Sequence, residues 1–288
     1  MSLSGQNLSI VIVTLKSEKV IHDCIKSIDQ NIPIIIVENS NNYELKKNLE
    51  SQYKNLKCVI TEKNLGMGAA NNKGIKLVNT DYVYILNPDT TLEKNTLENL
   101  FLESKKIPDF SIISPIHSDS NFPNWKNTLE KNFDKSQPFQ VESVDGYSML
   151  LNKKNLKDLY FDENFFLYLE NDDFCLRARK AGGSILIMPN SKINHKGAKA
   201  VDSKYEKEIE LSRNWHWIWS KFYFNKKHYG FLKAFIEGFP RFFLSIFKYL
   251  FFLLINNKTK KKIYLNRALG FYNAAIGKSS WYRPNLDD

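Results

Sequence analysis

The sequence predicts an α/β fold in which a mostly parallel central sheet is flanked by helices and followed by a helical appendage. In the first half, short runs of β-branched residues alternate with stretches of about a dozen residues that suit helices. These runs are almost continuously apolar, as strands are when both faces of a parallel sheet are covered. The 288 residues, 43% of them hydrophobic, suffice for a core of roughly 200 residues and a further segment.

Four strands are expected in the first half of the chain. They cover residues 8–14, 33–37, 56–61 and 81–86. Open α/β sheets bind ligands at the carboxyl ends of their strands, and polar residues stand at three of these ends: Thr14, Glu38 and residues 87–89. We therefore expect a ligand site at this edge of the sheet. The alternatives are that Thr14 caps a helix near Ser17 and that residues 38–42 form a polar turn.

Asp89 directly follows the fourth predicted strand. A carboxylate at such a place is positioned to hold a divalent cation, because these hard ions prefer oxygen ligands and bridge phosphates to protein. The alternative is a turn over residues 87–91 followed by a helix from Glu93. Asp89 is accordingly the expected metal ligand.

A glycine-rich segment lies between the third and fourth predicted strands. Residues 64–74 read NLGMGAANNKG, which is neither a P-loop nor a G-x-G-x-x-G fingerprint. Small residues at the first turn of a helix let a nucleotide or a sugar approach the backbone. They also allow the helix to pack closely on the sheet. Both interpretations stay open for this segment.

A cluster of carboxylates lies among aromatic residues in residues 161–177, which read FDENFFLYLENDDFCLR. Ionised carboxylates in such surroundings are costly unless they hold protons, metals or sugar hydroxyls, so the cluster indicates a site. If a helix begins near Glu170, then Glu170, Asp173 and Arg177 share a face, and Asp173 is spaced to pair with Arg177. The alternative is an acidic helix start that complements the macrodipole, which leaves the aromatic run unexplained.

Seven motifs follow one another over about residues 8–220. They are VIVT, IVENS, NLGMGAANNKGI, YILNPDT, VDGYSML, the carboxylate cluster and INHKGAKA. Together they resemble glycosyltransferase family 2, and within it the rhamnosyltransferase-like bacterial enzymes that build surface polysaccharides. The resemblance implies a Rossmann-like GT-A fold. It also implies inverting transfer of a sugar from a dTDP- or UDP-linked donor to a saccharide or lipid-linked acceptor, usually with Mg²⁺ or Mn²⁺.

The resemblance assigns the donor side of the site residue by residue. Thr14 and Glu38 would contact the nucleoside. Residues from Asn64 to Asn71, with Gly66 among them, would line the donor pocket.

The metal motif departs from the family pattern. Asn87-Pro88-Asp89 stands where the family has a D-x-D-like motif, so the first carboxylate is replaced by Asn87 beside the donor. Asp89 must then bind the metal largely alone. His195 matches a family histidine that can join the metal or the diphosphate.

The carboxylate motif departs as well. Aligned on Arg177, the usual E-D-x-D reads Glu170-Asn171-Asp172-Asp173, so Asn171 stands where many relatives carry the catalytic base. An amide cannot take the proton of the acceptor, so Asp172 is the favoured base and Glu170 the alternative. Asp173 would orient the acceptor or pair with Arg177.

The acceptor is expected to lie near a strand around residues 141–144. Asp145 and Gly146 end this strand and would contact the acceptor together with Asn171 and Arg177; a simple turn at residues 145–146 is the alternative.

Two other functions compete with this interpretation. A sugar nucleotidyltransferase would carry a glycine-rich, arginine-containing loop after its first strand, where this chain has residues 14–17, TLKS. A catalytically degenerate protein that binds a nucleotide sugar, or a scaffold of a polysaccharide assembly complex, remains open because of Asn87 and Asn171. Turnover of a donor distinguishes this second alternative.

A cytoplasmic location is expected from two features. The three cysteines have no paired spacing, which indicates reduced thiols. The amino terminus lacks the basic, apolar and small-residue pattern of an export signal.

Two domains are expected, a GT-A domain over residues 1–212 and a basic, aromatic-rich helical region over residues 213–288. The second region holds 14 basic and 3 acidic residues. Its apolar run at residues 242–255 is shorter than the roughly 20 residues of a spanning helix but suits the membrane interface, and nearby lysines favour anionic headgroups. We expect peripheral contact with the inner face of the cell membrane. Packing on the catalytic domain or in a homodimer is the alternative, and no nucleic-acid module is recognisable.

Overall fold

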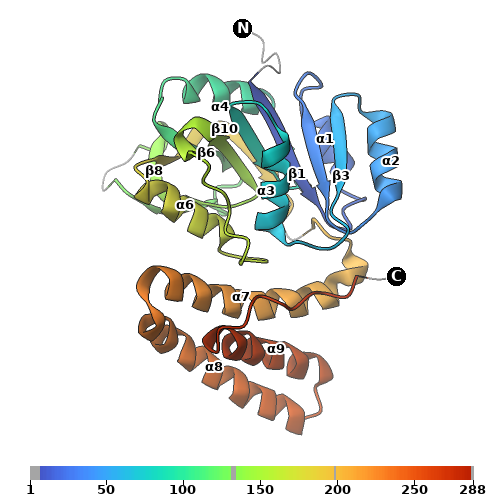
Figure 1. Ribbon diagram of the computed structural model, residues 1–288, viewed down its shortest axis with the longest axis vertical. Coiled ribbons are helices and arrows are strands. Elements are labelled where there is room, and N and C mark those ends of the chain that lie inside the picture. The colour runs from blue at the N-terminus through green and yellow to red at the C-terminus, as the bar shows by residue number, and fades with distance from the viewer. Residues whose placement is uncertain (1–6, 131–133, 198, 287–288) are drawn as a thin grey trace. The chain divides into compact units, whose positions relative to one another are not determined.

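The computed structural model describes residues 7–130, 134–197 and 199–286. The chain forms two compact units (Figure 1). The first comprises the residues up to 162 together with residues 171–202, and the second comprises residues 163–170 together with the residues from 203 onward.

The first unit is built on one sheet, whose strands run in the order β3-β2-β1-β4-β9-β6-β10-β8-β7, while β5 pairs with β10. The strands are β1 (Leu8–Thr14), β2 (Ile34–Glu38), β3 (Leu56–Ile60), β4 (Tyr82–Leu86), β5 (Thr90–Leu92), β6 (Phe110–His117), β7 (Trp125–Thr128), β8 (Phe139–Val144), β9 (Ser148–Asn152) and β10 (Ser184–His195). The four predicted strands are confirmed as β1 to β4. They pair in parallel, β1 with β2 and β4, and β2 with β3.

The rest of the sheet is mixed. Strand β9 lies between β4 and β6 and is antiparallel to both, whereas β6 and β10 are parallel. Strands β7 and β8 form an antiparallel pair whose register sets Lys126 opposite Ser143. The α/β fold class is confirmed, with a parallel amino-terminal half and a mixed second half.

Helices cover both faces of this sheet (Figure 1). They are α1 (Ile21–Lys26), α2 (Tyr43–Gln52), α3 (Met67–Leu77), α4 (Thr96–Ser104), α5 (Lys153–Leu156) and α6 (Glu170–Lys180). Every residue of β1 is buried; Ile10 and Ile12 enter one core and Val11 enters the other, because successive side chains of a strand point to opposite faces. A Cβ atom on Gly74 of α3 would lie 2.3 Å from Cγ1 of Val11, so this glycine allows close packing of α3 on β1.

The second unit is helical, as predicted. It contains η1 (Ser203–Tyr205), α7 (Glu206–Tyr229), α8 (Phe231–Leu254) and α9 (Lys258–Ala275). The predicted domain boundary between residues 212 and 213 falls inside α7. This helix begins at Glu206, with Glu206 and Glu208 in its first turn, and not at the aromatic run that starts with Trp215. None of the described helices combines the length and the apolar character needed to cross a membrane.

His216 fastens the carboxy-terminal segment to α7. One of its ring nitrogens lies 2.9 Å from the carbonyl oxygen of Tyr282 and the other lies 3.0 Å from the hydroxyl of Ser280. Burial lowers the pKa of His216 to about 3, and the nearby Arg283 guanidinium contributes to this shift. The imidazole is therefore neutral in the folded protein at neutral pH.

Candidate active site

Thr14 and Glu38 end neighbouring strands and face each other in the register of β1 and β2. The hydroxyl of Thr14 is buried and has no hydrogen-bond partner among the described residues. Helix α1 begins only at Ile21, so Thr14 does not cap it. A buried hydroxyl without a partner at the carboxyl edge of the sheet fits a ligand contact.

Glu38 organises the loop that follows β2. Its carboxylate accepts hydrogen bonds from the backbone N–H groups of Ser40 and Asn42, the latter at 2.7 Å, and from the hydroxyl of Ser40. Asn42 in turn caps α2 by accepting from the N–H of Leu45. The polar turn that was the alternative interpretation is therefore present, and Glu38 holds its shape.

The segment from Asn64 to Asn71 is held against the end of β2. Asn39 donates to Oδ1 of Asn64 at 3.0 Å and accepts from the N–H of Leu65 at 2.9 Å. Gly66 then precedes α3 with a φ of 84°, a conformation that favours glycine. Asn71 is buried in the second turn, and its Oδ1 has no hydrogen-bond partner among the described residues. Asn71, like Thr14, thus has a buried polar atom without a partner in the described part of the chain.

Asp89 and His195 come together at the end of β4. Oδ1 of Asp89 lies 3.3 Å from Nε2 of His195, and its Oδ2 accepts from the N–H of Lys199 at 3.2 Å. The side chain of Asp89 is buried. Although His195 is close to it, Oδ1 makes no hydrogen bond in the part of the chain that is described. The imidazole stacks on the ring of Tyr147 at 4.1 Å, and the N–H of Asn87 donates to the carbonyl of Tyr147.

The structure does not show the helix that the alternative interpretation of the segment after Asp89 placed at Glu93. No helix starts at Glu93; residues 90–92 form β5, which pairs with the end of β10 so that Thr90 faces His195, and α4 begins only at Thr96. This alternative fails because the threonine-rich segment that resembles a turn pairs with a strand from a distant part of the chain. This pairing is what brings His195 to Asp89.

The pair suits a divalent cation only in part. Among the described residues, no group of three or more His, Cys, Asp or Glu side chains is arranged to hold a metal ion. Asp89 and His195 supply at most two ligands, a carboxylate oxygen and an imidazole nitrogen. The buried Oδ1 without a donor fits a cation, provided that the other ligands come from a bound anion.

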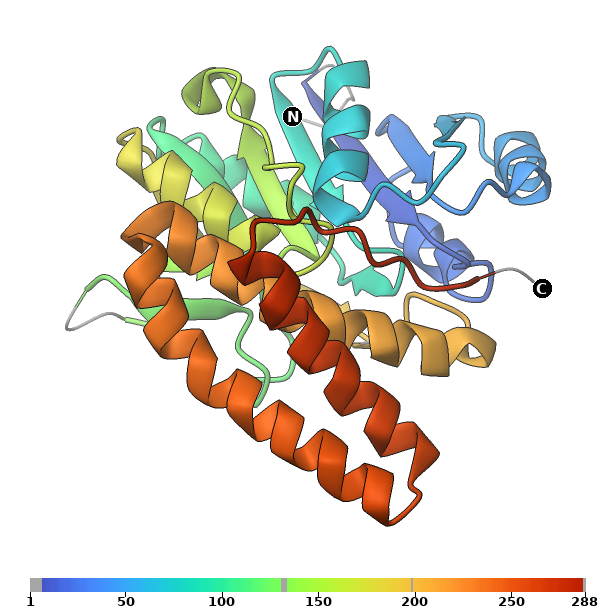
Figure 2. The ribbon, with the colours of Figure 1, turned by 60° about the horizontal axis from the view of Figure 1, so that its bottom comes forward.

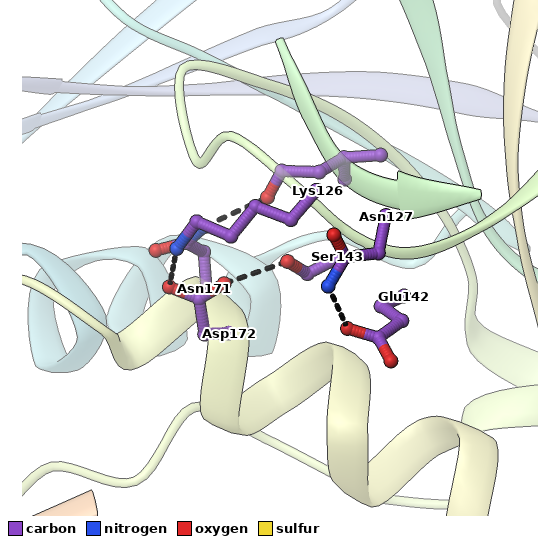
Figure 3. A network of polar contacts seen from close by, with 7 residues as sticks. Lys126, Asn127, Glu142, Ser143, Asn171 and Asp172 are labelled. Atoms are coloured by element: carbon purple, nitrogen blue, oxygen red, sulfur yellow. Dashed lines mark hydrogen bonds and ion pairs between the residues drawn. The ribbon is translucent and has the colours of Figure 1, made fainter.

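The predicted helix start at Glu170 is confirmed, since α6 begins there. Oδ1 of Asp172 accepts a hydrogen bond from the hydroxyl of Ser143 at 2.6 Å, and its Oδ2 lies 2.5 Å from Nζ of Lys126 (Figure 3). These partners stand opposite each other on β8 and β7. We name Lys126, Ser143 and Asp172 the hairpin clamp, because it fastens the β7–β8 hairpin to α6.

Sequence reasoning missed two members of the clamp. Lys126 and Ser143 belong to no motif, and the only signal was that Ser143 lies in the strand predicted around residues 141–144. Their convergence depends on the register of the hairpin.

The predicted ion pair between Asp173 and Arg177 is present. Nε of Arg177 lies 2.7 Å from Oδ2 of Asp173, and its Nη2 donates to the carbonyl oxygen of Tyr160 at 2.6 Å. Asp173 is fully buried. The pair fastens α6 to the segment before it, which favours the pairing role of Asp173 over direct contact with an acceptor.

Asn171 touches the loop that follows β8. The amide of Asn171 donates to the carbonyl oxygen of Val144 at 2.7 Å. A Cβ atom added to Gly146 would lie 3.4 Å from the Cβ atom of Asn171. Burial raises the pKa of the neighbouring Asp145, an effect that the Lys126 ammonium opposes and the Asp172 carboxylate reinforces. Asp145, Gly146 and Asn171 therefore lie together beside the hairpin clamp. Glu170 is grouped with the second unit.

The chain matches known proteins over most of its length. The family model described as Glycosyl transferase family 2 matches residues 9–173, more than half of the chain. The low-salt glycan biosynthesis hexosyltransferase Agl10 of Haloferax volcanii is 26% identical over 226 residues, which cover 72% of this chain and 69% of that protein. The uncharacterized glycosyltransferase MJ1057 of Methanocaldococcus jannaschii is 26% identical over 59% of this chain and 63% of its own length.

Solved structures share the fold. Residues 1–349 of S. aureus TarS in complex with UDP-GlcNAc superpose with a TM-score of 0.55 at 16% identity, over 98% of this chain and 95% of that chain. GalNAc-T7 with UDP, GalNAc and Mn²⁺ superposes with a TM-score of 0.54 at 16% identity, over 73% of this chain and 51% of that chain. The chain thus spans about half the length of GalNAc-T7. These similarities confirm a GT-A-like fold.

Proposed function

Because the chain belongs to glycosyl transferase family 2, we propose that it transfers a sugar, with inversion, from a nucleoside diphosphate donor to a hydroxyl of a saccharide or lipid-linked acceptor in cell-surface polysaccharide synthesis. A UDP-linked hexose is the first donor to consider, since a relative is named as a hexosyltransferase and similar structures hold UDP or UDP-GlcNAc. A dTDP-linked rhamnose is the second donor to consider, because the motifs resemble those of rhamnosyltransferase-like enzymes. The observation that carries the proposal is the buried Oδ1 of Asp89, which has no hydrogen-bond donor among the described residues and lies beside His195.

The donor would bind along the carboxyl edge of β1, β2 and β4. The Thr14 hydroxyl and the Asn71 amide are buried polar groups with an atom to spare for a ligand in the described structure. Glu38 would act mainly by holding the shape of the loop after β2, and Asn64 and Gly66 by shaping the pocket.

Asp89 and His195 would hold Mg²⁺ or Mn²⁺, with Asn87 beside the donor. When bound, such an ion supplies positive charge that stabilises the diphosphate as it leaves. The fit rests on the chemistry of the two groups, a hard carboxylate oxygen and an imidazole nitrogen.

On the acceptor side, Asp172 would take the proton of the attacking hydroxyl. The hairpin clamp uses one hydrogen bond on each carboxylate oxygen, and each oxygen can accept a further one. Lys126 pairs with the buried carboxylate, and Ser143 fixes its orientation. Asp145, Gly146 and Asn171 would line the acceptor, Arg177 would act through its pair with Asp173, and Glu170 is the alternative base.

The test is a thermal-shift screen followed by a turnover assay. A ligand that binds only the folded state raises the melting temperature, so UDP, dTDP and their sugars, each with and without Mn²⁺, identify the donor. Sugar transfer is then measured as release of the nucleoside diphosphate from that donor, with an oligosaccharide acceptor present. We expect metal-dependent stabilisation by one nucleotide and turnover of its sugar.

A second candidate is a catalytically degenerate protein that binds a nucleotide sugar without turnover, or a scaffold of an assembly complex. Asn87 and Asn171 favour it, because both replace carboxylates of the family pattern. This candidate would be established if a donor stabilises the wild type without any release of the nucleoside diphosphate, and if Asn171→Asp gains activity.

We also propose that the enzyme works in the cytoplasm, peripherally at the inner face of the cell membrane. The basic excess of residues 213–288 supports this location, because the inner leaflet carries anionic lipids. A homodimer through the same helices is the competing arrangement.

A further inference from the structure

Helix α8 exposes most of its apolar side chains. Within this helix, whose residues are all described, only Ala234 and Ser245 are buried. Seven large apolar residues lie at spacings of three and four along its whole length, which places them on one face. This apolar stripe consists of Leu232, Ile236, Phe239, Phe243, Phe247, Leu250 and Leu254, and its members are between 44% and 85% exposed.

The opposite side of α8 packs on α9, which runs beside it (Figure 2). Phe242 stacks on Phe271 with their ring centroids 4.9 Å apart, and Phe252 stacks on Tyr264 at 5.5 Å. The apolar run at residues 242–255 therefore divides between two faces. Side chains such as Phe242 hold the helical unit together. Those of the apolar stripe, which starts at Leu232 and so precedes the run, are exposed.

The charged residues of α8 do not interrupt the apolar stripe. The charges of α8 are Lys233, Glu237, Arg241 and Lys248, and all four lie outside the positions of the stripe. Residues 238–286 contain nine basic and no acidic residues. Lys258, Lys260 and Lys262 are exposed at the start of α9, next to the end of the stripe. The surface is therefore apolar along α8 and cationic at the start of α9.

We propose that the apolar stripe lies in the interface of an anionic lipid bilayer, with α8 parallel to the membrane plane and the flanking lysines at the headgroups. This inference rests on the proposed membrane location. A helix of 24 residues extends about 36 Å, and its apolar face enters the headgroup boundary by roughly 5–10 Å. Anionic headgroups match the positive charge, and the long lysine side chains at the start of α9 reach them from the end of the stripe. A second copy of this chain would bring like charge to the same place.

The test is flotation of the full chain with vesicles of phosphatidylcholine, with and without phosphatidylglycerol. We expect binding only to vesicles that contain phosphatidylglycerol, and weaker binding as added salt screens the lysines. Phe243→Gln/Phe247→Gln removes two members of the stripe that are 67% and 62% exposed, and it should weaken binding at least about tenfold. The matched control is Leu77→Gln/Leu102→Gln, two residues of the first unit that are 44% and 46% exposed, which should bind like the wild type.

The charge is tested separately with Lys258→Gln/Lys260→Gln/Lys262→Gln, which should also lose binding to the anionic vesicles. The proposal is overturned if the wild type does not float with them, or if the Phe243→Gln/Phe247→Gln variant floats equally well. It is also overturned if light scattering shows a dimer that this variant dissociates, because a second copy then covers the stripe. Stabilisation by UDP with Mn²⁺, measured without lipid, is independent of these outcomes, so failure of the donor site and failure of the membrane surface are distinguishable.

Discussion

Nζ of Lys126 lies 2.5 Å from Oδ2 of Asp172, although the two residues come from β7 and from α6. The lysine side chain is half exposed, whereas that of Asp172 is 10% exposed. An ionised carboxylate this deeply buried needs a partner. The hairpin clamp thus gives the residue that we assign as the base an ion-pair partner and a fixed orientation.

Replacing the clamp lysine should therefore affect catalysis more than donor binding. Lys126→Met is expected to lower kcat by roughly 10-fold to 100-fold, because it leaves the buried Asp172 carboxylate without its ion-pair partner and with only Ser143 to orient it. Lys126→Arg keeps the positive charge and should restore most of the activity. An unchanged kcat in Lys126→Met would remove Lys126 from the acceptor side of the site.

The base itself is tested at the two neighbouring carboxylates. Asp172→Asn should lower turnover by roughly 10² to 10⁴ and leave UDP affinity nearly intact, as expected when a general base is lost. Glu170→Gln is the matched control, and a larger loss in this variant would transfer the role to Glu170. Asn171→Asp restores the usual family residue and should preserve or raise activity.

His216 predicts a pH dependence for the helical unit. Its folded-state pKa of about 3 lies below the ordinary value of 6.5, so its contribution to stability is complete above pH 6.5 and is lost as the pH falls toward 3. The loss amounts to a few kcal/mol over this range. Tryptophan fluorescence follows it, because Trp215 and Trp219 belong to this core.

The comparison for this prediction is His216→Gln, which keeps hydrogen-bonding groups but does not titrate. Between about pH 7 and about pH 4, the wild type should lose more stability than the variant. Parallel losses in the two proteins would show that His216 does not control the acid stability of the helices.

Gly74 allows α3 to lie against β1. Gly74→Ala places a Cβ atom 2.3 Å from Cγ1 of Val11 and should destabilise the protein by about 1–3 kcal/mol in urea unfolding. Adding Val11→Ala removes the colliding atom, so the double variant should lose less than the sum of the single changes. If the losses of unfolding free energy were additive, the contact between position 74 and Val11 would not be the reason that a glycine is needed there.

The sequence predicted the parallel half of the sheet and the start of α6, because these depend on apolar runs and on spacing within one segment. It also predicted the pair of Asp173 with Arg177, four residues apart on one helix. Strand β5 and the hairpin clamp were not predictable in this way. The place of His195 beside Asp89 and that of Lys126 beside Asp172 depend on pairings between distant segments, and these follow only from the register of the folded sheet.

The proposed function depends most on the donor site at Asp89. Isothermal titration calorimetry of UDP, with and without Mn²⁺, tests it on the wild type, on Asp89→Ala and on His195→Ala. We expect the wild type to bind UDP at least about tenfold more tightly with Mn²⁺, Asp89→Ala to lose this metal dependence and His195→Ala to lose part of it. Metal-dependent binding that is undiminished in Asp89→Ala would contradict the account.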